Sequence, residues 1–262
     1  MKRSIIILSI ILVFCSYKTI IEKPKMNNIE KENVWVFIMA GQSNMAGRGT
    51  VEPEDTVPDK RILSINKDGQ VIIAKEPLHF YEPERTGLDC GLSFARTLIT
   101  KIPNNVSILI IPTAVGGSSI GQWLGDSVFR NVKLFSNFVE KVAIAKQNGV
   151  IKGILWHQGE SDANEMNIPL HKQRLHSLFS KFRAVIGNKD LPVLLGELGS
   201  FSGNRDNFDL INKSFHEYAA EDKNGIVIST GDLKDKGDHL HFNSESQRAM
   251  GKRFAEAYLK ML

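Results

Sequence analysis

The chain has 262 residues, of which 42% are hydrophobic and 24% are charged, so it is long and apolar enough to bury a sizeable core. Its formal net charge is +4 at pH 7. No cluster of basic residues forms a nucleic-acid-binding patch, so we expect no nucleic-acid partner. The two cysteines, Cys15 and Cys90, give no disulfide framework if Cys15 is processed during export, and Cys90 is expected to be a packed, inert thiol.

Residues 1–15 are typical of an export signal. Lys2 and Arg3 supply a positive start, and the apolar run that follows has secretory length but is too short to span a bilayer. The sequence Leu12-Val-Phe-Cys15 is similar to a lipoprotein cleavage site, although Phe14 is bulkier than usual there. We expect a periplasmic, secreted or cell-surface protein, with membrane attachment through a lipidated Cys15 as one route. Residues 16–32 are polar and are interpreted as a tether.

Residues 33–262 are predicted to form one α/β domain. Val34–Ala40 is a continuous apolar run that predicts a strand buried on both faces. Residues 47–89 are irregular and are interpreted as an insertion that carries a small hairpin over the carboxyl ends of the strands. The remaining strands and helices alternate, which predicts a three-layer α/β/α sandwich around a mostly parallel, five-stranded sheet. The further strands are expected at 106–111, 151–156, 192–198 and 226–230, and the helices at 91–102, 131–148, 168–186, 209–222 and 244–262.

Each predicted strand runs into a polar or glycine-rich loop. The carboxyl ends of parallel strands meet at one edge of a sheet, so these loops are expected to share a pocket. The absence of a Gly-x-Gly-x-x-Gly or Walker sequence disfavours the nucleotide-binding versions of this architecture. The loops are Gly41–Asn44, Pro112–Trp123, Trp156–Asp162, Gly196–Gly199 and Gly231–Asn243.

Three residues in these loops fit acyl transfer by a serine. Ser43 at the end of the first strand is a candidate nucleophile, with helix capping as the alternative. Asp238 and His241 are three residues apart, a spacing that can hold the carboxylate on Nδ1 and leave Nε2 facing Ser43. Candidate oxyanion donors are the backbone N–H groups of Ser43, Gly116 and Gly117 and the side-chain amide of Gln158. Each such donor contributes roughly 2.7–4 kcal/mol to transition-state stabilisation.

Four segments together resemble the SGNH hydrolases, and more narrowly the sialate O-acetylesterase and acetylxylan esterase branch (carbohydrate esterase family 6, SASA domain). They are Gly41-Gln-Ser-Asn-Met45, Gly116-Gly-Ser-Ser-Ile-Gly-Gln-Trp123, Trp156-His-Gln-Gly-Glu-Ser-Asp162 and Asp238-x-x-His241. The resemblance implies a flavodoxin-like SGNH hydrolase fold and a serine esterase without metal or cofactor. It also implies an O-acetylated carbohydrate as substrate, which would be sialic acid, xylan or a related glycan.

The resemblance implies the same roles for Ser43, His241 and Asp238, and the same oxyanion donors. Glu160 is a second acid that could support His241. Gln122 and Trp123 would line the acyl or sugar pocket, with a core role as the alternative for Trp123. The further candidate substrate-binding residues are Gln42, Asn44 and His157.

Four alternatives compete with this interpretation. Ser119 lies at the centre of Gly117-Ser-Ser-Ile-Gly121, a Gly-x-Ser-x-Gly sequence, but no helical pattern follows it directly. A metal hydrolase would draw its ligands from the acidic and histidine residues of the same loops, but no metal-binding spacing occurs. The third alternative is a carbohydrate-binding protein without activity. The fourth is an esterase or lipase that acts on a non-carbohydrate ester. The possible metal ligands are His157, Glu160, Asp162, Asp238, His239 and His241.

Overall fold

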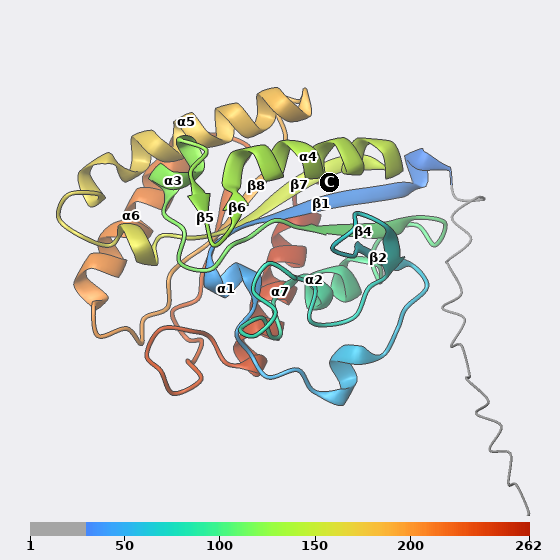
Figure 1. Ribbon diagram of the computed structural model, residues 1–262, viewed down its shortest axis with the longest axis horizontal. Coiled ribbons are helices and arrows are strands. Elements are labelled where there is room, and N and C mark those ends of the chain that lie inside the picture. Colours follow the sequence, from blue (N-terminus) through green and yellow to red (C-terminus); the bar gives the residue numbers. More distant parts are fainter. Residues whose placement is uncertain (1–29) are drawn as a thin grey trace, which may run out of the picture.

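The structure, a computed structural model, describes residues 30–262. The predicted export signal, Cys15 and the predicted tether up to residue 29 lie outside the described residues. A seven-stranded sheet forms the centre of the domain, in the order β3-β2-β4-β1-β7-β8-β9 (Figure 1). Its strands are β1 (Val34–Gly41), β2 (Ile62–Ile65), β3 (Val71–Ile73), β4 (Ser107–Pro112), β7 (Val150–His157), β8 (Val193–Gly196) and β9 (Gly225–Ile228).

The five predicted strands correspond to β1, β4, β7, β8 and β9, which pair in parallel. Taken alone they have the order 2-1-3-4-5, which is the flavodoxin-like arrangement. The position predicted for the hairpin was wrong. It extends the sheet instead of covering its carboxyl edge, because β2 pairs in parallel with β4 and β3 pairs antiparallel with β2.

Helices cover both faces of the sheet (Figure 1). One face carries α3 (Ile120–Leu124), α4 (Leu134–Asn148), α5 (Ile168–Ile186) and α6 (Arg205–Glu221), and the other carries α2 (Gly91–Leu98) and α7 (Ser244–Leu259). The central strand β1 serves both layers because successive side chains of a strand point to opposite faces. Val36 and Ile38 pack in the first layer, whereas Phe37 and Met39 pack in the second.

The sequence pattern did not indicate α3 or the small hairpin of β5 (Val128–Phe129) and β6 (Val132–Lys133). These elements are short, so too few residues repeat for a period to be visible. The four-residue helix α1 (Ser43–Ala46) follows β1 directly. The remaining elements are single 3₁₀ turns, η2 (Lys31–Asn33), η3 (Pro53–Thr56) and η4 (Glu160–Asp162).

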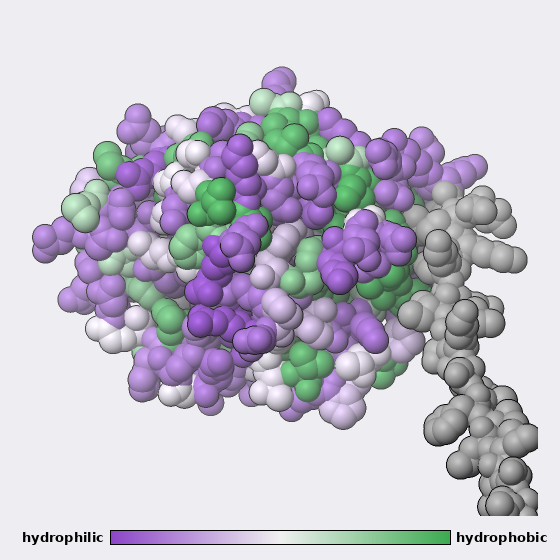
Figure 2. Space-filling model, viewed as in Figure 1, coloured by the Kyte–Doolittle hydropathy of each residue, from purple (hydrophilic) through white to green (hydrophobic). Residues whose placement is uncertain are grey.

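Hydrophilic side chains predominate on the face shown in Figure 2, and the apolar ones form separate small groups. Large exposed apolar side chains within the described residues, such as Val57, Val128 and Met166, lie in different parts of the chain. Among residues 30–262, no helix is both long and apolar enough to cross a bilayer.

Candidate active site

The turn after β1 places the Ser43 hydroxyl at the carboxyl edge of the sheet. Gly41 has a φ of +139°, and a Cβ there would collide with the backbone carbonyl of His157, so only glycine fits. The next N–H, that of Gln42, donates to the same carbonyl at 2.9 Å. Ser43 therefore opens α1 beside the end of β7. The helix N-cap is Gln42 rather than Ser43, so the Ser43 hydroxyl is not used for capping.

The loop before α7 brings His241 to Ser43, although 198 residues separate them along the chain. His241 Nε2 lies 2.9 Å from Ser43 Oγ, and His241 Nδ1 lies 2.7 Å from Asp238 Oδ2. A carboxylate can only accept hydrogen bonds, so Nδ1 carries the hydrogen and Nε2 is left as an acceptor for the Ser43 hydroxyl. The three side chains predicted to act together are thus in contact, in the order that acyl transfer needs.

Asp238 is held by its own turn. Its Oδ1 accepts the backbone N–H groups of Leu240 (3.0 Å) and His241 (2.8 Å). Partial burial of the carboxyl acts to raise its pKa, but these hydrogen bonds and that of the His241 ring outweigh it and lower the pKa of Asp238 to about 2. The carboxylate is therefore ionised at any pH at which the protein would be assayed.

Glu160, the second acid considered for His241, lies elsewhere. Its Oε1 accepts a hydrogen bond from Asn44 Nδ2 at 2.7 Å and is 3.8 Å from His157 Nδ1. Burial, partly opposed by Glu160, lowers the pKa of His157, so this ring is neutral at pH 7. Asp238 is thus the acid in contact with His241.

Two of the four predicted oxyanion donors are available to a substrate. Within residues 30–262 the backbone N–H groups of Ser43 and Gly117 make no hydrogen bond. Val115 N–H donates to the Gly41 carbonyl at 3.1 Å, so the 115–117 turn lies against the end of β1. Gly117 itself is partly exposed and has a φ of +82°. Of the four predicted donors, these two amides are the ones without an acceptor among the described residues.

The predictions for Gly116 and Gln158 were wrong. The Gly116 N–H donates to Glu82 Oε2 at 2.6 Å. The Gln158 Nε2 donates to Asp162 Oδ2 at 2.7 Å and is 3.2 Å from both Gln42 Oε1 and the Ser118 carbonyl. With acceptors inside the protein for its two hydrogens, the buried Gln158 amide ties neighbouring loops together and does not face a substrate.

Glu82 is a contributor that sequence reasoning missed. It lies in the irregular 47–89 segment, where no periodicity or motif singled it out. Its buried carboxylate accepts the Gly116 N–H and pairs with Arg48 Nη2 at 2.9 Å, and Arg130 Nε is 3.3 Å away. The pairs with two arginines compensate the cost of burying this carboxylate. Glu82 thereby fixes the turn that presents the Gly117 amide.

The predicted substrate-binding residues are internal. Gln42, Asn44 and His157 are at most 3% exposed. Gln42 Oε1 accepts the Ser161 N–H, Asn44 Nδ2 donates to Glu160, and His157 Nε2 is 2.9 Å from the Glu197 carbonyl oxygen. Trp123 is fully buried against Trp156, and its Nε1 donates to Ser118 Oγ at 2.9 Å, so its role is in the core. For Gln42, Asn44 and His157 the structure shows internal contacts in place of the predicted substrate contacts, and for Trp123 it favours the core role that the sequence left open. The sequence locates a loop but not the direction of its side chains.

Gln122 and Ser119 form the N-terminal cap of α3. Ser119 Oγ accepts the Gln122 N–H at 3.2 Å, and Gln122 Oε1 accepts the Ser119 N–H at 2.9 Å. This is a capping box, a common helix start. No imidazole contacts Ser119 among the described residues, so it is not placed as a nucleophile, and the Gln122 oxygen is used in the cap and not for substrate.

The positions of the other histidine, acidic and cysteine side chains bear on two alternative chemistries, metal catalysis and attack by a thiol. In the part of the chain that the structure describes, no three His, Cys, Asp or Glu side chains are grouped so as to hold a metal ion. Cys90 is fully buried, and burial raises the pKa of its thiol well above its usual value. Neither a metal centre nor a cysteine nucleophile is indicated by the arrangement of these side chains.

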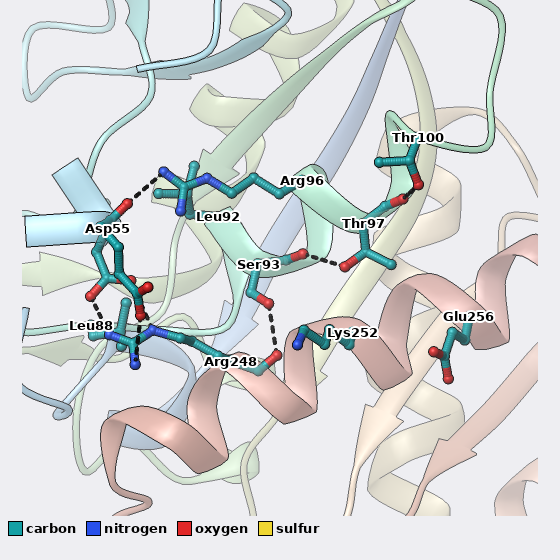
Figure 3. A pocket seen from close by; sticks show the side chains of 11 residues that line it. Asp55, Leu88, Leu92, Ser93, Arg96, Thr97, Thr100, Arg248, Lys252 and Glu256 are labelled. Atoms are coloured by element: carbon teal, nitrogen blue, oxygen red, sulfur yellow. Dashed lines mark hydrogen bonds and ion pairs between the residues drawn. The ribbon is translucent and has the colours of Figure 1, made fainter. Parts of the chain in front are cut away.

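A hollow between α2 and α7 is distinct from the Ser43 site. Arg248 of α7 points to Asp55 in η3, and Arg248 Nε is 2.9 Å from Asp55 Oδ1 (Figure 3). Arg96 of α2 donates to the carbonyls of Glu54 and Val57 at 2.9 and 2.8 Å. These charged groups are used to hold the 52–57 segment against both helices, so the hollow is explained by structural contacts.

Comparisons with known proteins bear on the family and the fold of the chain. Residues 33–260 match the model of a family described as "Carbohydrate esterase, sialic acid-specific acetylesterase" (SASA). A probable carbohydrate esterase of Arabidopsis thaliana is 26% identical over 257 residues, which are 91% of this chain and 95% of that protein. The crystal structure of the Arabidopsis protein covers 87% of this chain and 98% of its own, with a TM-score of 0.77 and 27% identity.

More distant solved structures share the fold. NanS is 21% identical, with a TM-score of 0.69, and the match covers 89% of this chain and 98% of NanS. A carbohydrate acetylesterase from Xanthomonas citri is 19% identical, with a TM-score of 0.65, over 85% of this chain and 55% of that protein. The mixed α/β sandwich is therefore the one found in SGNH-type hydrolases.

Proposed function

The chain belongs to the SASA family of carbohydrate esterases, and on this premise we propose that it removes O-acetyl groups from a carbohydrate through an acetyl-enzyme intermediate. The observation that carries the mechanism is the unbroken contact from Asp238 through His241 to Ser43 Oγ. Sialic acid, xylan and related glycans are the candidate substrates. The name of the family favours an O-acetylated sialic acid as the first to test.

The first half of the reaction forms the acetyl-enzyme. Ser43 Oγ attacks the acetyl carbonyl carbon while His241 Nε2 takes the hydroxyl proton. The carbonyl oxygen becomes negative and accepts hydrogen bonds from the backbone N–H groups of Ser43 and Gly117. The C–O bond to the sugar then breaks, and His241 gives its proton to the departing sugar oxygen. Asp238 stays ionised throughout and stabilises the imidazolium that forms.

The second half returns the enzyme to its starting state. A water molecule attacks the acetyl carbonyl, and His241 Nε2 takes one of its protons. The bond to Ser43 Oγ breaks and His241 returns the proton to the serine. Acetic acid, which keeps the second proton of the water, leaves and ionises to acetate in solvent. Every proton and electron pair is accounted for by Ser43, His241 and water, so the proposal calls for no metal or cofactor.

The test compares two serines that lie in neighbouring loops. Acetate release from p-nitrophenyl acetate and from O-acetylated sialic acid and xylan is measured for the wild type, Ser43→Ala and Ser119→Ala. Ser43→Ala should fall to background. Ser119→Ala removes only a helix cap, worth about 1 kcal/mol of stability, and should retain activity. A dead Ser119→Ala beside an active Ser43→Ala would overturn the assignment, and a wild type inert on every ester would favour a carbohydrate-binding protein.

We also propose that the protein is exported, since residues 1–15 have the composition of a signal peptide and end in Cys15. Expression of the full chain in a bacterium, followed by fractionation, tests this. The proposal requires activity in the periplasm, the medium or the membrane fraction. Cys15→Ser should release a lipid-anchored form into the soluble fraction, whereas recovery of the wild type from the cytoplasm would refute export.

A further inference from the structure

Asn44 follows the candidate nucleophile and is 1% exposed. Its side chain bonds to groups on both sides of His241. Asn44 Oδ1 accepts the Phe242 N–H at 3.1 Å, and Asn44 Nδ2 donates to the Leu240 carbonyl at 3.1 Å. One amide thus bonds to the peptide groups that precede and follow the histidine, and the Ser43 turn is joined to the His241 loop by a second route besides the Ser43–His241 contact.

The orientation of this amide is determined by its partners. A backbone N–H can only donate and a backbone carbonyl can only accept, so the oxygen of Asn44 must face Phe242 and its nitrogen must face Leu240. The second hydrogen of Asn44 Nδ2 then points to Glu160 Oε1, 2.7 Å away. The Glu160 side chain is 4% exposed, and its Oε2 has no hydrogen-bond partner in residues 30–262. Asn44 is therefore the hydrogen-bond donor that holds this carboxylate.

We propose that Asn44 is a positioning residue, which with Glu160 sets the place of His241 against Ser43. This inference rests on the proposed function, because it assigns a role within the same site. Glu160 acts on the histidine through Asn44 and not by contact. The backbone of Asn44 is also held, since Gln247 Nε2 of α7 donates to the Asn44 carbonyl at 2.9 Å. A buried network in which each group constrains the next transmits a change at one member to all.

The discriminating variant is Asn44→Asp, which has nearly the same shape. Its Oδ1 still accepts the Phe242 N–H, but an oxygen replaces the nitrogen that faced Leu240 and Glu160, so two acceptors lose their donor and oppose a charge. We expect kcat to fall about 100-fold while KM changes less than about threefold, because the Asn44 side chain is buried and bonded internally. A rise in KM with an unchanged kcat would overturn the proposal and restore Asn44 as a substrate contact.

Rescue separates positioning from mere loss of stability. In the double variant Asn44→Asp with Glu160→Gln, the amide introduced in place of the Glu160 carboxylate can donate to the new carboxylate, and we expect kcat to recover at least about tenfold. Glu160→Gln alone keeps an acceptor for Asn44 Nδ2, so we expect kcat to fall, but less than in Asn44→Asp. A double variant no better than Asn44→Asp would contradict the role assigned to Glu160 and refute the proposal.

The matched control is Asn243→Asp, which adds the same charge two residues beyond His241. Asn243 Oδ1 caps α7 by accepting the Ser246 N–H at 2.9 Å, and aspartate caps equally well. This variant should retain wild-type activity. If it falls as far as Asn44→Asp, added charge and not the lost donor explains the effect, and the proposal fails.

A readout that needs no turnover completes the test. The ring signals of His241 in ¹⁵N-histidine-labelled protein should shift or broaden in Asn44→Asp, return in the double variant and stay unchanged in Asn243→Asp. If Asn44→Asp leaves the His241 signals unchanged, the positioning role is refuted even when the wild type is an active esterase. A wild type without esterase activity would refute the proposed function instead, and the NMR result would still decide whether Asn44 places His241.

Discussion

Replacement of Asp238 by asparagine tests the orientation of the candidate base. The new side chain would keep an oxygen for the Leu240 and His241 N–H groups, which bond to Asp238 Oδ1 at 3.0 and 2.8 Å, so the turn should survive. Its amide nitrogen would then face His241 Nδ1, which is 2.7 Å from the present Oδ2. As a donor, this nitrogen stabilises the ring tautomer with hydrogen on Nε2. That hydrogen points to Ser43 Oγ, and the ring cannot take the serine proton.

The expected loss follows from the role of the base. Removal of general-base catalysis costs about 10²- to 10⁴-fold in rate, and the equivalent change in a serine protease lies at the upper end of that range. This corresponds to about 3–5 kcal/mol of transition-state stabilisation. The Asp238 side chain is 37% exposed, and water can replace part of its effect, so we expect kcat for acetyl ester hydrolysis to fall about 10³-fold at unchanged KM.

The matched control is Asp235→Asn in the same loop. Asp235 Oδ2 accepts the Gly237 and His239 N–H groups at 3.0 and 2.7 Å and does not contact His241. Steady-state hydrolysis of p-nitrophenyl acetate, with circular dichroism to verify folding, compares the two variants. Asp235→Asn should be within about threefold of the wild type. An Asp238→Asn enzyme that retains more than about a tenth of wild-type kcat would refute the assignment of Asp238 as the orienting acid.

Three further results are expected. Gly116→Ala should lower both kcat and Tm, because the added Cβ would collide with Arg48. Gly125→Ala should be nearly neutral, because the atom nearest to its added Cβ would be 3.4 Å away. Equal effects of the two variants on kcat and Tm would contradict this packing argument. Trp123→Phe should lower Tm through its lost core contacts and hydrogen bond, yet leave KM unchanged, and a raised KM would instead place the indole in the substrate pocket. Burial, and to a smaller extent the charge of Asp89, raises the pKa of Glu76 well above its usual value of 4.5. Folding therefore favours the protonated carboxyl. The resulting contribution to stability is present below pH 4.5 and is lost as the pH rises through the folded-state pKa. The Tm of Glu76→Gln relative to wild type should therefore increase from pH 5 to pH 8, and a difference that is constant with pH would refute it.

Local sequence patterns were sufficient to predict the five parallel strands, the long helices and the candidate reactive groups. The apolar run of β1, the alternation of strands with helices and the three-residue spacing of Asp238 and His241 are all short-range features. Their consequences follow from chain geometry, because a parallel sheet gathers its strand ends at one edge. The candidate nucleophile and the Asp238–His241 pair could be named for this reason.

The tertiary structure alone decided which of these polar groups are bonded internally. The partners of Gly116, Asn44 and Gln158 lie far away in sequence: Glu82 is 34 residues from Gly116, and 116 residues separate both Asn44 from Glu160 and Gln158 from Gln42. A motif shows that these polar groups belong to one site. Most buried polar groups are hydrogen-bonded, however, and packing decides which partner each one has. The hairpin of β2 and β3 joined the sheet for a similar reason, since the unpaired N–H and C=O groups along the edge of β4 were satisfied by adding a strand.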